Sequence, residues 1–166
     1  MVKEGEMENI DIVGADEILP NLFLGSITSI IFLNDVKEEY LSDWCIVSVL
    51  DDEEATLLCR IPDLCHEHIL LDIKDEPKYK ISENFDRVND FISWSLEHKK
   101  KVLVHCTAGI SRSTTLVCAY LMAEKNITAK KALDIIRKQR SQACPNSGFR
   151  KQLSNYERHL TEVRGK

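Results

Sequence analysis

The sequence lacks a long hydrophobic run, since no stretch approaches the ~20 apolar residues that a membrane-spanning helix needs. The first 16 residues are acidic and polar, which also argues against a secretory signal. No internal repeat or low-complexity segment is visible. A chain of 166 residues with 43 % hydrophobic residues is typical of one globular domain. We therefore expect one folded domain over 17–162, a flexible acidic lead-in over 1–16, and no association with membranes.

An aromatic-laced basic motif of the kind that binds nucleic acid is also missing, so no nucleic-acid partner is expected. The net charge of −5 conceals an uneven distribution. Residues 1–100 contain 23 acidic and 9 basic residues, whereas residues 101–166 contain 4 acidic and 13 basic residues. Solvated helix faces explain this difference most simply. The alternative is that the basic half surrounds a pocket for anionic substrates.

The six cysteines show neither a disulfide framework nor a zinc motif. A domain of this size builds a hydrophobic core without disulfides, so we expect reduced thiols and a cytoplasmic or nuclear location. Cys59, Cys65, His66 and His68 fall within ten residues, but their spacing is not that of a zinc finger or knuckle. Surface and strand positions explain these residues, and neither a metal nor any other cofactor is expected.

Short apolar runs alternate with helical patterns along the chain. The runs predict strands at 22–24, 45–50, 69–71 and 102–104. Three helical patterns begin at residues that can cap a helix, namely Ser82, Thr128 and Asn146. One or two further helices are expected within 27–43. This alternation predicts an α/β fold with a central, largely parallel sheet of four to five strands flanked by helices.

The most informative segment runs from His105 to Ser113 and has the sequence HCTAGISRS. Cys106 and Arg112 lie between a predicted strand and a predicted helix at 114–123. A loop in that position directs backbone N–H groups and the positive end of a helix dipole at one place, which suits a phosphate dianion. The same environment favours the thiolate form of a cysteine. The sequence therefore predicts a phosphate-binding loop with a nucleophile at its floor.

This segment resembles the HCxxGxxR[S/T] signature of the cysteine-dependent protein tyrosine phosphatase superfamily. Three further stretches resemble the dual-specificity phosphatases within that superfamily: EILPNLFLGS at 17–26, AYLM at 119–122 and PNSGF at 145–149. Together the four stretches extend the resemblance over about 18–160. The resemblance implies a protein tyrosine phosphatase-like fold in which 17–162 is the catalytic domain. It also places the chain with the small, atypical members that have no kinase-docking domain.

The resemblance assigns the residues of this loop to steps in the hydrolysis of a phosphate ester. Cys106 would be the nucleophile that forms a cysteinyl-phosphate, and Arg112 would bind two phosphoryl oxygens with its planar guanidinium. Ser113 would help the thiolate to leave, and His105 would orient the loop rather than transfer protons. The phosphate would meet the backbone N–H groups of Thr107, Ala108, Gly109, Ile110, Ser111 and Arg112.

The general acid is expected upstream of the loop, because the family places an aspartate about thirty residues before the cysteine. Asp75 lies 31 residues before Cys106, in a segment that precedes a predicted helix. Asp72 is the alternative, although it directly continues the predicted strand at 69–71. We expect Asp75 to protonate the leaving oxygen and then to accept a proton from water.

The side chains inside the predicted phosphate-binding loop indicate the class of substrate. Its variable positions carry no charged side chain, whereas phosphoinositide phosphatases of the superfamily carry lysines there. We therefore expect phosphorylated proteins as substrates, and the resemblance implies hydrolysis of phosphotyrosine and of phosphoserine or phosphothreonine. Two alternatives are a phosphatase of a non-protein phosphate and a phosphoprotein-binding module with little turnover.

Overall fold

The structure, a computed structural model, describes residues 11–36, 38–59 and 61–165. The strands are β1 (Ala15–Leu19), β2 (Leu22–Gly25), β3 (Trp44–Leu50), β4 (Glu67–Asp72) and β5 (Lys101–His105). Within the described residues they form a five-stranded sheet in the order β1-β2-β5-β3-β4. β1 is antiparallel to β2, and the other neighbouring pairs are parallel. The predicted α/β fold with a largely parallel sheet is therefore confirmed.

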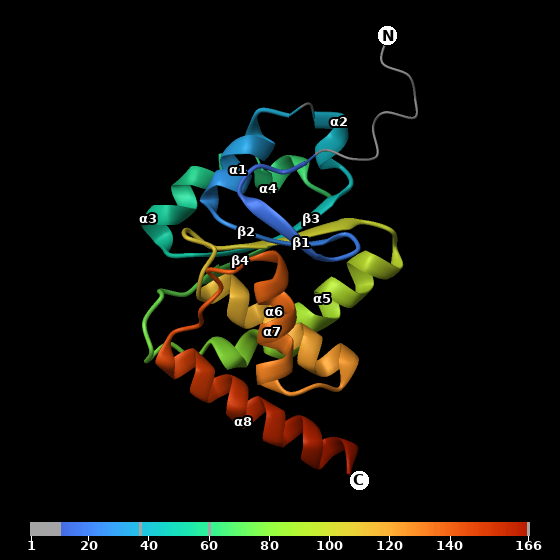
Figure 1. The fold of residues 1–166 in the computed structure, drawn as a ribbon. Coiled ribbons are helices and arrows are strands. Elements are labelled where there is room, and N and C mark those ends of the chain that lie inside the picture. The colour runs from blue at the N-terminus through green and yellow to red at the C-terminus, as the bar shows by residue number, and fades with distance from the viewer. Residues whose placement is uncertain (1–10, 37, 60, 166) are drawn as a thin grey trace.

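Helices cover both faces of the sheet (Figure 1). One face carries α1 (Ile27–Asn34), α2 (Glu38–Leu41), α3 (Asp52–Ala55), the short 3₁₀ helix η1 (Thr56–Leu58) and α4 (Ile61–Leu64). The other carries the 3₁₀ helix η2 (Ile81–Asn84), α5 (Phe85–Glu97), α6 (Arg112–Lys125), α7 (Ala129–Gln139) and α8 (Ser147–Arg164). α8 is the outermost helix and packs on α6, α7 and η2 rather than on the sheet. No helix in the described ranges is both long enough and apolar enough to cross a bilayer.

The alternation of side chains along the strands creates two hydrophobic cores, one on each face of the sheet. In β5, Val102 and Val104 point into the larger core, which is completed by α5, α6, α7 and α8. Leu103 between them points into the smaller core, which contains Ile30 and Leu33 of α1. All five side chains are fully or almost fully buried, as expected for parallel strands that are covered on both faces.

The parallel arrangement brings the carboxyl ends of β2, β3, β4 and β5 to one edge of the sheet. The segments that follow these strands are residues 26–27, α3, residues 73–80 and residues 106–111. Ligands of open α/β sheets bind at this edge, because the connections between strands and helices meet there. The segment from His105 to Ser113 therefore lies where a ligand-binding site is expected.

Two details differ from the sequence-based expectations. β1 begins at Ala15 and Ile12 is buried, so the boundary predicted after residue 16 falls inside a strand of the domain. The apolar side chains in this acidic segment explain why it joins the sheet; residues 1–10 lie outside the described residues. Ser82 does not cap α5, because it lies inside η2 and its amide donates to the side chain of Gln152 at 3.0 Å.

Other local predictions are confirmed. The side chain of Thr128 accepts a hydrogen bond from the amide of Lys131, and that of Asn146 accepts one from the amide of Phe149. These bonds cap α7 and α8 at their N-termini. Residues 27–43 contain two helices, α1 and α2.

Candidate active site

The segment from Cys106 to Ser111 connects β5 to α6 and turns its carbonyl groups outward. Three carbonyl oxygens accept hydrogen bonds from groups behind the loop: Thr107 from the Ile27 amide (3.0 Å), Gly109 from Arg140 Nε (2.7 Å) and Ile110 from the Cys144 amide (2.8 Å). The C=O and N–H of a trans peptide point in opposite directions. The amides that follow these carbonyls, those of Ala108, Ile110 and Ser111, therefore point to the inner side of the loop. These three amides face the side of the loop on which the sequence predicts a bound phosphate.

Gly109 adopts a backbone conformation that other residues resist, with φ at +66°. A Cβ at this position would lie 2.5 Å from the guanidinium of Arg140 and 2.7 Å from the carbonyl oxygen of Gly25. Arg140 is itself buried and forms an ion pair with Asp16 of β1 at 2.7 Å. Its charge polarises the peptide between Gly109 and Ile110, which makes the Ile110 amide a stronger donor toward an anion.

The thiol of Cys106 lies at the floor of the loop and is only 2 % exposed. Its Sγ accepts a hydrogen bond from the Gly109 amide at 3.2 Å and lies 3.1 Å from the hydroxyl oxygen of Ser113. A thiolate has no proton to give, so in that state Ser113 is the donor. Both contacts, together with the N-terminus of α6, stabilise negative charge on the sulfur.

Arg112, the first residue of α6, is held from behind by Glu54 of α3. Nη1 donates to Glu54 Oε2 at 2.7 Å and to the carbonyl oxygen of Ile73 at 3.0 Å, while Nη2 donates to Glu54 Oε1 at 3.1 Å. The Nε atom is buried and has no hydrogen-bond partner in the part of the chain that the structure describes. A buried cationic donor without a partner is costly, so this atom is suited to an anionic ligand.

Glu54 was not predicted from the sequence. The Asp51 and Glu54 side chains form a capping box at the start of α3, a pattern that the sequence does display. Nothing in that pattern indicates that the same carboxylate binds an arginine 58 residues away. The hydrogen bond from Arg112 lowers the pKa of Glu54 from 4.5 to about 2, so the carboxylate is ionised and holds the guanidinium as a charged pair.

His105 is fully buried at the end of β5, and burial lowers its pKa to about 3, so the ring is neutral. Its Nδ1 lies 3.2 Å from the carbonyl oxygen of Cys106, which can only accept, so Nδ1 carries the proton. Nε2 then accepts from the hydroxyl of Ser48 at 2.6 Å, and that hydroxyl accepts from His68 Nε2 at 2.9 Å. This chain of hydrogen bonds across β4, β3 and β5 fixes the tautomer of His105 and anchors the Cys106 backbone.

Asp75 lies in the segment between β4 and η2, and its Oδ1 accepts a hydrogen bond from Asn146 Nδ2 at 2.9 Å. Burial lowers the pKa of Arg112, but the hydrogen bond to Glu54 and the charges of Cys106, Glu54 and Asp75 raise it by more. Asp75 therefore lies close enough for its charge to act on Arg112. Asp72, the alternative candidate, is the last residue of β4.

The structure therefore brings Cys106, Arg112, Ser113, His105 and the backbone of 107–111 together at one place. The residues that sequence reasoning missed are those that hold the site from other elements: Glu54, Ser48, His68, Arg140 and Asn146. For Cys59, Cys65, His66 and His68, no cluster of three or more potential metal ligands is found in the described residues. His66 stacks on Trp94, with ring centroids 6.0 Å apart.

A thiol at the floor of a ring of amides, beside a buried guanidinium and at a helix N-terminus, defines the class of protein tyrosine phosphatase-like domains with a cysteine-based phosphate-binding loop. The family described as dual specificity phosphatase, catalytic domain, matches residues 35–159. The chain belongs to this family.

Individual relatives agree with this assignment. Human dual specificity protein phosphatase 22 is 33 % identical, over 88 % of this chain and 75 % of its own length. Human dual specificity protein phosphatase 5 is 38 % identical over 89 % of this chain, but the chain spans only 36 % of that relative. The crystal structure of the human tyrosine phosphatase-like serine/threonine/tyrosine-interacting protein has a TM-score of 0.80 and 33 % identity, and covers 89 % of this chain and 98 % of its own.

Proposed function

We propose that this protein is a phosphatase that hydrolyses phosphotyrosine and phosphoserine or phosphothreonine in proteins, through a cysteinyl-phosphate intermediate. The observation that carries the proposal is the combination of the Cys106 thiol with the inward-facing amides and with the Nε of Arg112, which has no partner among the described residues. Together they form a cradle for a phosphoryl group directly above a nucleophile. Membership of the dual specificity phosphatase family supports the same reaction.

In the first step, the Cys106 thiolate attacks phosphorus and the bond from phosphorus to the ester oxygen breaks. Charge on the phosphoryl oxygens is stabilised by the loop amides and by Arg112, whose orientation is fixed by Glu54. The departing oxygen takes a proton from Asp75, which acts as general acid. The products of this step are the free hydroxyl and a phosphate ester of Cys106.

In the second step, water attacks the cysteinyl-phosphate and releases inorganic phosphate. Asp75, now a carboxylate, accepts a proton from that water. The sulfur leaves as a thiolate, which the hydroxyl of Ser113 stabilises across the 3.1 Å contact. His105 takes no part in these proton transfers, because its ring is neutral and both of its nitrogens are engaged in hydrogen bonds with Ser48 and the Cys106 carbonyl.

A protein substrate is supported by the uncharged side chains inside the loop, since a highly phosphorylated headgroup would call for additional cations there. A cytoplasmic or nuclear location is part of the same proposal, because a nucleophilic thiol needs a reducing environment. The phosphoprotein-binding module is the second candidate, and one solved relative is described as a phosphatase-like interacting protein.

The test compares wild type with Cys106→Ser on p-nitrophenyl phosphate, on phosphopeptides and on inositol phosphates, under reducing conditions. We expect wild type to hydrolyse the first two, and the variant to lose turnover by roughly 10⁴-fold or more while it still binds vanadate or phosphate. Wild-type turnover in the Cys106→Ser variant would contradict the assignment of Cys106 as the nucleophile. A folded wild-type protein that hydrolyses none of these substrates would favour the binding module, and a clear preference for inositol phosphates would overturn the protein substrate.

A further inference from the structure

The two edge strands of the sheet differ in what keeps a further strand from pairing with them. An edge strand exposes backbone N–H and C=O groups, and proteins usually block such edges with bulges, prolines or charged side chains. At β1 the register with β2 shifts between Glu17 and Leu19, and Pro20 follows the strand. Asp16 of the same strand is bound to Arg140, which ends α7. β4 pairs with β3 in an unbroken register, contains neither proline nor lysine, and has β3 as its sole strand neighbour in the described part of the chain.

The hydrogen bonds of β5 show which backbone groups point toward which neighbouring strand. The amide of Val102, whose side chain enters the larger core, donates toward β2, to the carbonyl oxygen of Asn21 at 2.8 Å. The amide of Lys101, the preceding residue, donates in the opposite direction, toward β3, to the carbonyl oxygen of Asp43 at 2.9 Å. Residues alternate in this way along every strand of a parallel sheet.

The same alternation identifies the groups that β4 leaves open. Ile69 and Leu71 enter the same core as Val102 does, so their backbone groups point toward β3. The residues that alternate with them are His68, Leu70 and Asp72. Their N–H and C=O groups therefore point away from the sheet, along its open edge.

This edge is complementary to a second copy of itself. Leu70 lies at its centre and is 46 % exposed, with His68 two residues before it and Asp72 two residues after it. If two copies pair antiparallel about a two-fold axis at Leu70, this leucine lies opposite Leu70 of the second copy, and each His68 lies opposite an Asp72. All three outward-pointing residues then form hydrogen-bonded pairs, and each pair exchanges two backbone bonds.

The charges around β4 favour the same orientation. Its carboxyl end is acidic, because Asp72 lines a cavity together with Asp51, Asp52 and Glu53. An antiparallel pair places this end of one copy beside the amino end of the other, where His68 lies, so that the acidic ends of the two copies stay apart. A pairing of two carboxyl ends would bring like charges together, which is unfavourable.

We propose that the protein forms a symmetric dimer in which the β4 strands of two copies pair antiparallel about Leu70, so that one sheet runs through both copies. The blocked edge at β1 prevents further growth, so the assembly ends at two copies. The strand pair is a small interface, and the dimer should therefore be weak, with a dissociation constant of roughly 10–100 µM. β3 separates this edge from the phosphate-binding loop that follows β5, so each copy keeps its own site.

The first test is residue-resolved hydrogen exchange of the wild-type protein, started at about 5 µM and at about 500 µM, concentrations on either side of the expected dissociation constant. We expect the amides of His68, Leu70 and Asp72 to exchange several-fold more slowly at the higher concentration. The amides of Ile69 and Leu71 should be protected equally at both concentrations, because they bond to β3 within one copy. Exchange at β4 that does not depend on concentration would overturn the proposal.

The second test is sedimentation velocity over the same concentrations for wild type, Leu70→Lys and Val163→Lys. Leu70→Lys places two ammonium groups opposite each other at the axis and should weaken association at least tenfold. Val163→Lys is the matched control, since it changes an exposed aliphatic residue of α8 that lies outside the sheet and should leave association unchanged. Circular dichroism checks that both variants are folded. A wild type that stays monomeric, a dimer that persists in Leu70→Lys, or an equal loss in both variants would each contradict pairing through β4.

Discussion

The two ends of α8 make similar bonds to different kinds of partner. At its N-terminal end, which we term the catalytic end, Asn146, Gly148 and Gln152 hold the Asp75 segment and the phosphate-binding loop. α8 has 18 residues and is therefore about 27 Å long at 1.5 Å per residue. Toward its C-terminus lies what we term the distal end, where Glu157 and Arg164 face the connection between α6 and α7. Each end uses side chains of α8 to bind polar groups of a neighbouring segment.

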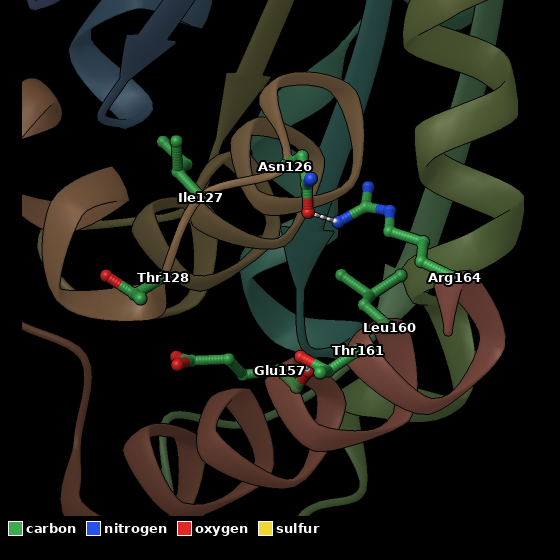
Figure 2. Close-up of a pocket in the computed structure, with 7 residues that line it drawn as sticks. All are labelled: Asn126, Ile127, Thr128, Glu157, Leu160, Thr161 and Arg164. Carbon is green, nitrogen blue, oxygen red and sulfur yellow. Dashed lines mark hydrogen bonds between the residues drawn. The ribbon is translucent and has the colours of Figure 1, made fainter.

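Figure 2 shows the distal end, where these side chains surround a small cavity of about 100 Å³. Arg164 donates to Asn126, the left-handed residue that ends α6, and to the last carbonyl groups of that helix. Glu157 accepts from the amide of Ala129 at the start of α7, at 2.8 Å. Apart from the side-chain oxygen of Asn126, these partners are backbone groups of the kind that a helix leaves unpaired at its ends.

The two ends of α8 differ in the parts of the molecule that they bind. The distal end stabilises the termini of two regular helices, whereas the catalytic end fixes loops that carry reacting groups. Loss of a contact at the distal end should therefore lower the stability of the fold and leave the chemistry unchanged. Loss of a contact at the catalytic end should change rates more than stability. Substitutions at both ends can break or sharpen this comparison.

Among substitutions that keep the Cys106 nucleophile, the largest effect is expected for Arg112→Lys, at the start of α6 in the site that the catalytic end of α8 supports. Lysine keeps the charge but cannot bind both oxygens of Glu54 and present a further donor to the phosphate at the same time. We expect kcat/KM to fall by roughly 10²–10³, the usual cost of removing a donor that stabilises transition-state charge. Steady-state kinetics with p-nitrophenyl phosphate measure this change. A lysine variant with near wild-type rates would show that the Arg112 fork is not used in catalysis.

A smaller effect is expected for Glu54→Gln, which keeps the shape of the partner but removes its charge. One of the two hydrogen bonds to Arg112 is lost, because the amide nitrogen cannot accept, and the guanidinium becomes less well fixed. We expect kcat/KM to fall about tenfold, by analogy with a misplaced charge-stabilising group. Asp52→Asn is the matched control, since it removes one acidic charge from the same short helix without touching Arg112. A similar loss in both variants would indicate a general charge effect.

The Glu54→Gln variant also tests how the free energy of unfolding depends on pH. The pKa of Glu54 is lowered from 4.5 to about 2 in the folded protein, so the folded state binds this proton less readily than the unfolded chain. Its stabilising contribution is therefore complete above pH 4.5 and disappears as the pH falls toward 2. The difference in unfolding free energy between wild type and Glu54→Gln should shrink over that range. A difference that stays constant across it would contradict the ion pair.

The part of the site that lies within one continuous segment could be predicted from the sequence. The order of strand, Cys106, Gly109, Arg112 and helix is local, and local geometry follows from the backbone that such a segment must adopt. The caps at Thr128 and Asn146 were predictable for the same reason.

The groups that hold the site from outside could not be predicted, because they depend on contacts between distant parts of the chain. Glu54 is 58 residues from Arg112, and Asn146 is 71 residues from Asp75. Their sequence signals, two helix caps, describe only the bond that each side chain makes within its own helix, and not the bonds to Arg112 and to Asp75. Ser82 failed as a predicted cap because the chain forms η2 over Ile81–Asn84 and α5 begins only at Phe85. The amide of Ser82 is bound by Gln152, 70 residues away, which is again a contact between distant parts of the chain.

The smallest effect on activity is expected for Arg164→Met, at the distal end. Removal of the guanidinium leaves carbonyl groups at the end of α6 without their charged donor, which costs about 1 kcal/mol. For a domain of this size that corresponds to a fall in melting temperature of roughly 2–4 °C. Arg158→Met is the matched control, because within the described residues this exposed arginine of α8 bonds only to the nearby Asn155 side chain, and its loss should leave the melting temperature unchanged. Thermal unfolding and kinetics on phenyl phosphate should be measured on both variants. If Arg164→Met lowered kcat/KM for phenyl phosphate as much as is expected for Glu54→Gln, the two ends of α8 would act as one rigid unit, and the separation between a stabilising end and a catalytic end would be wrong.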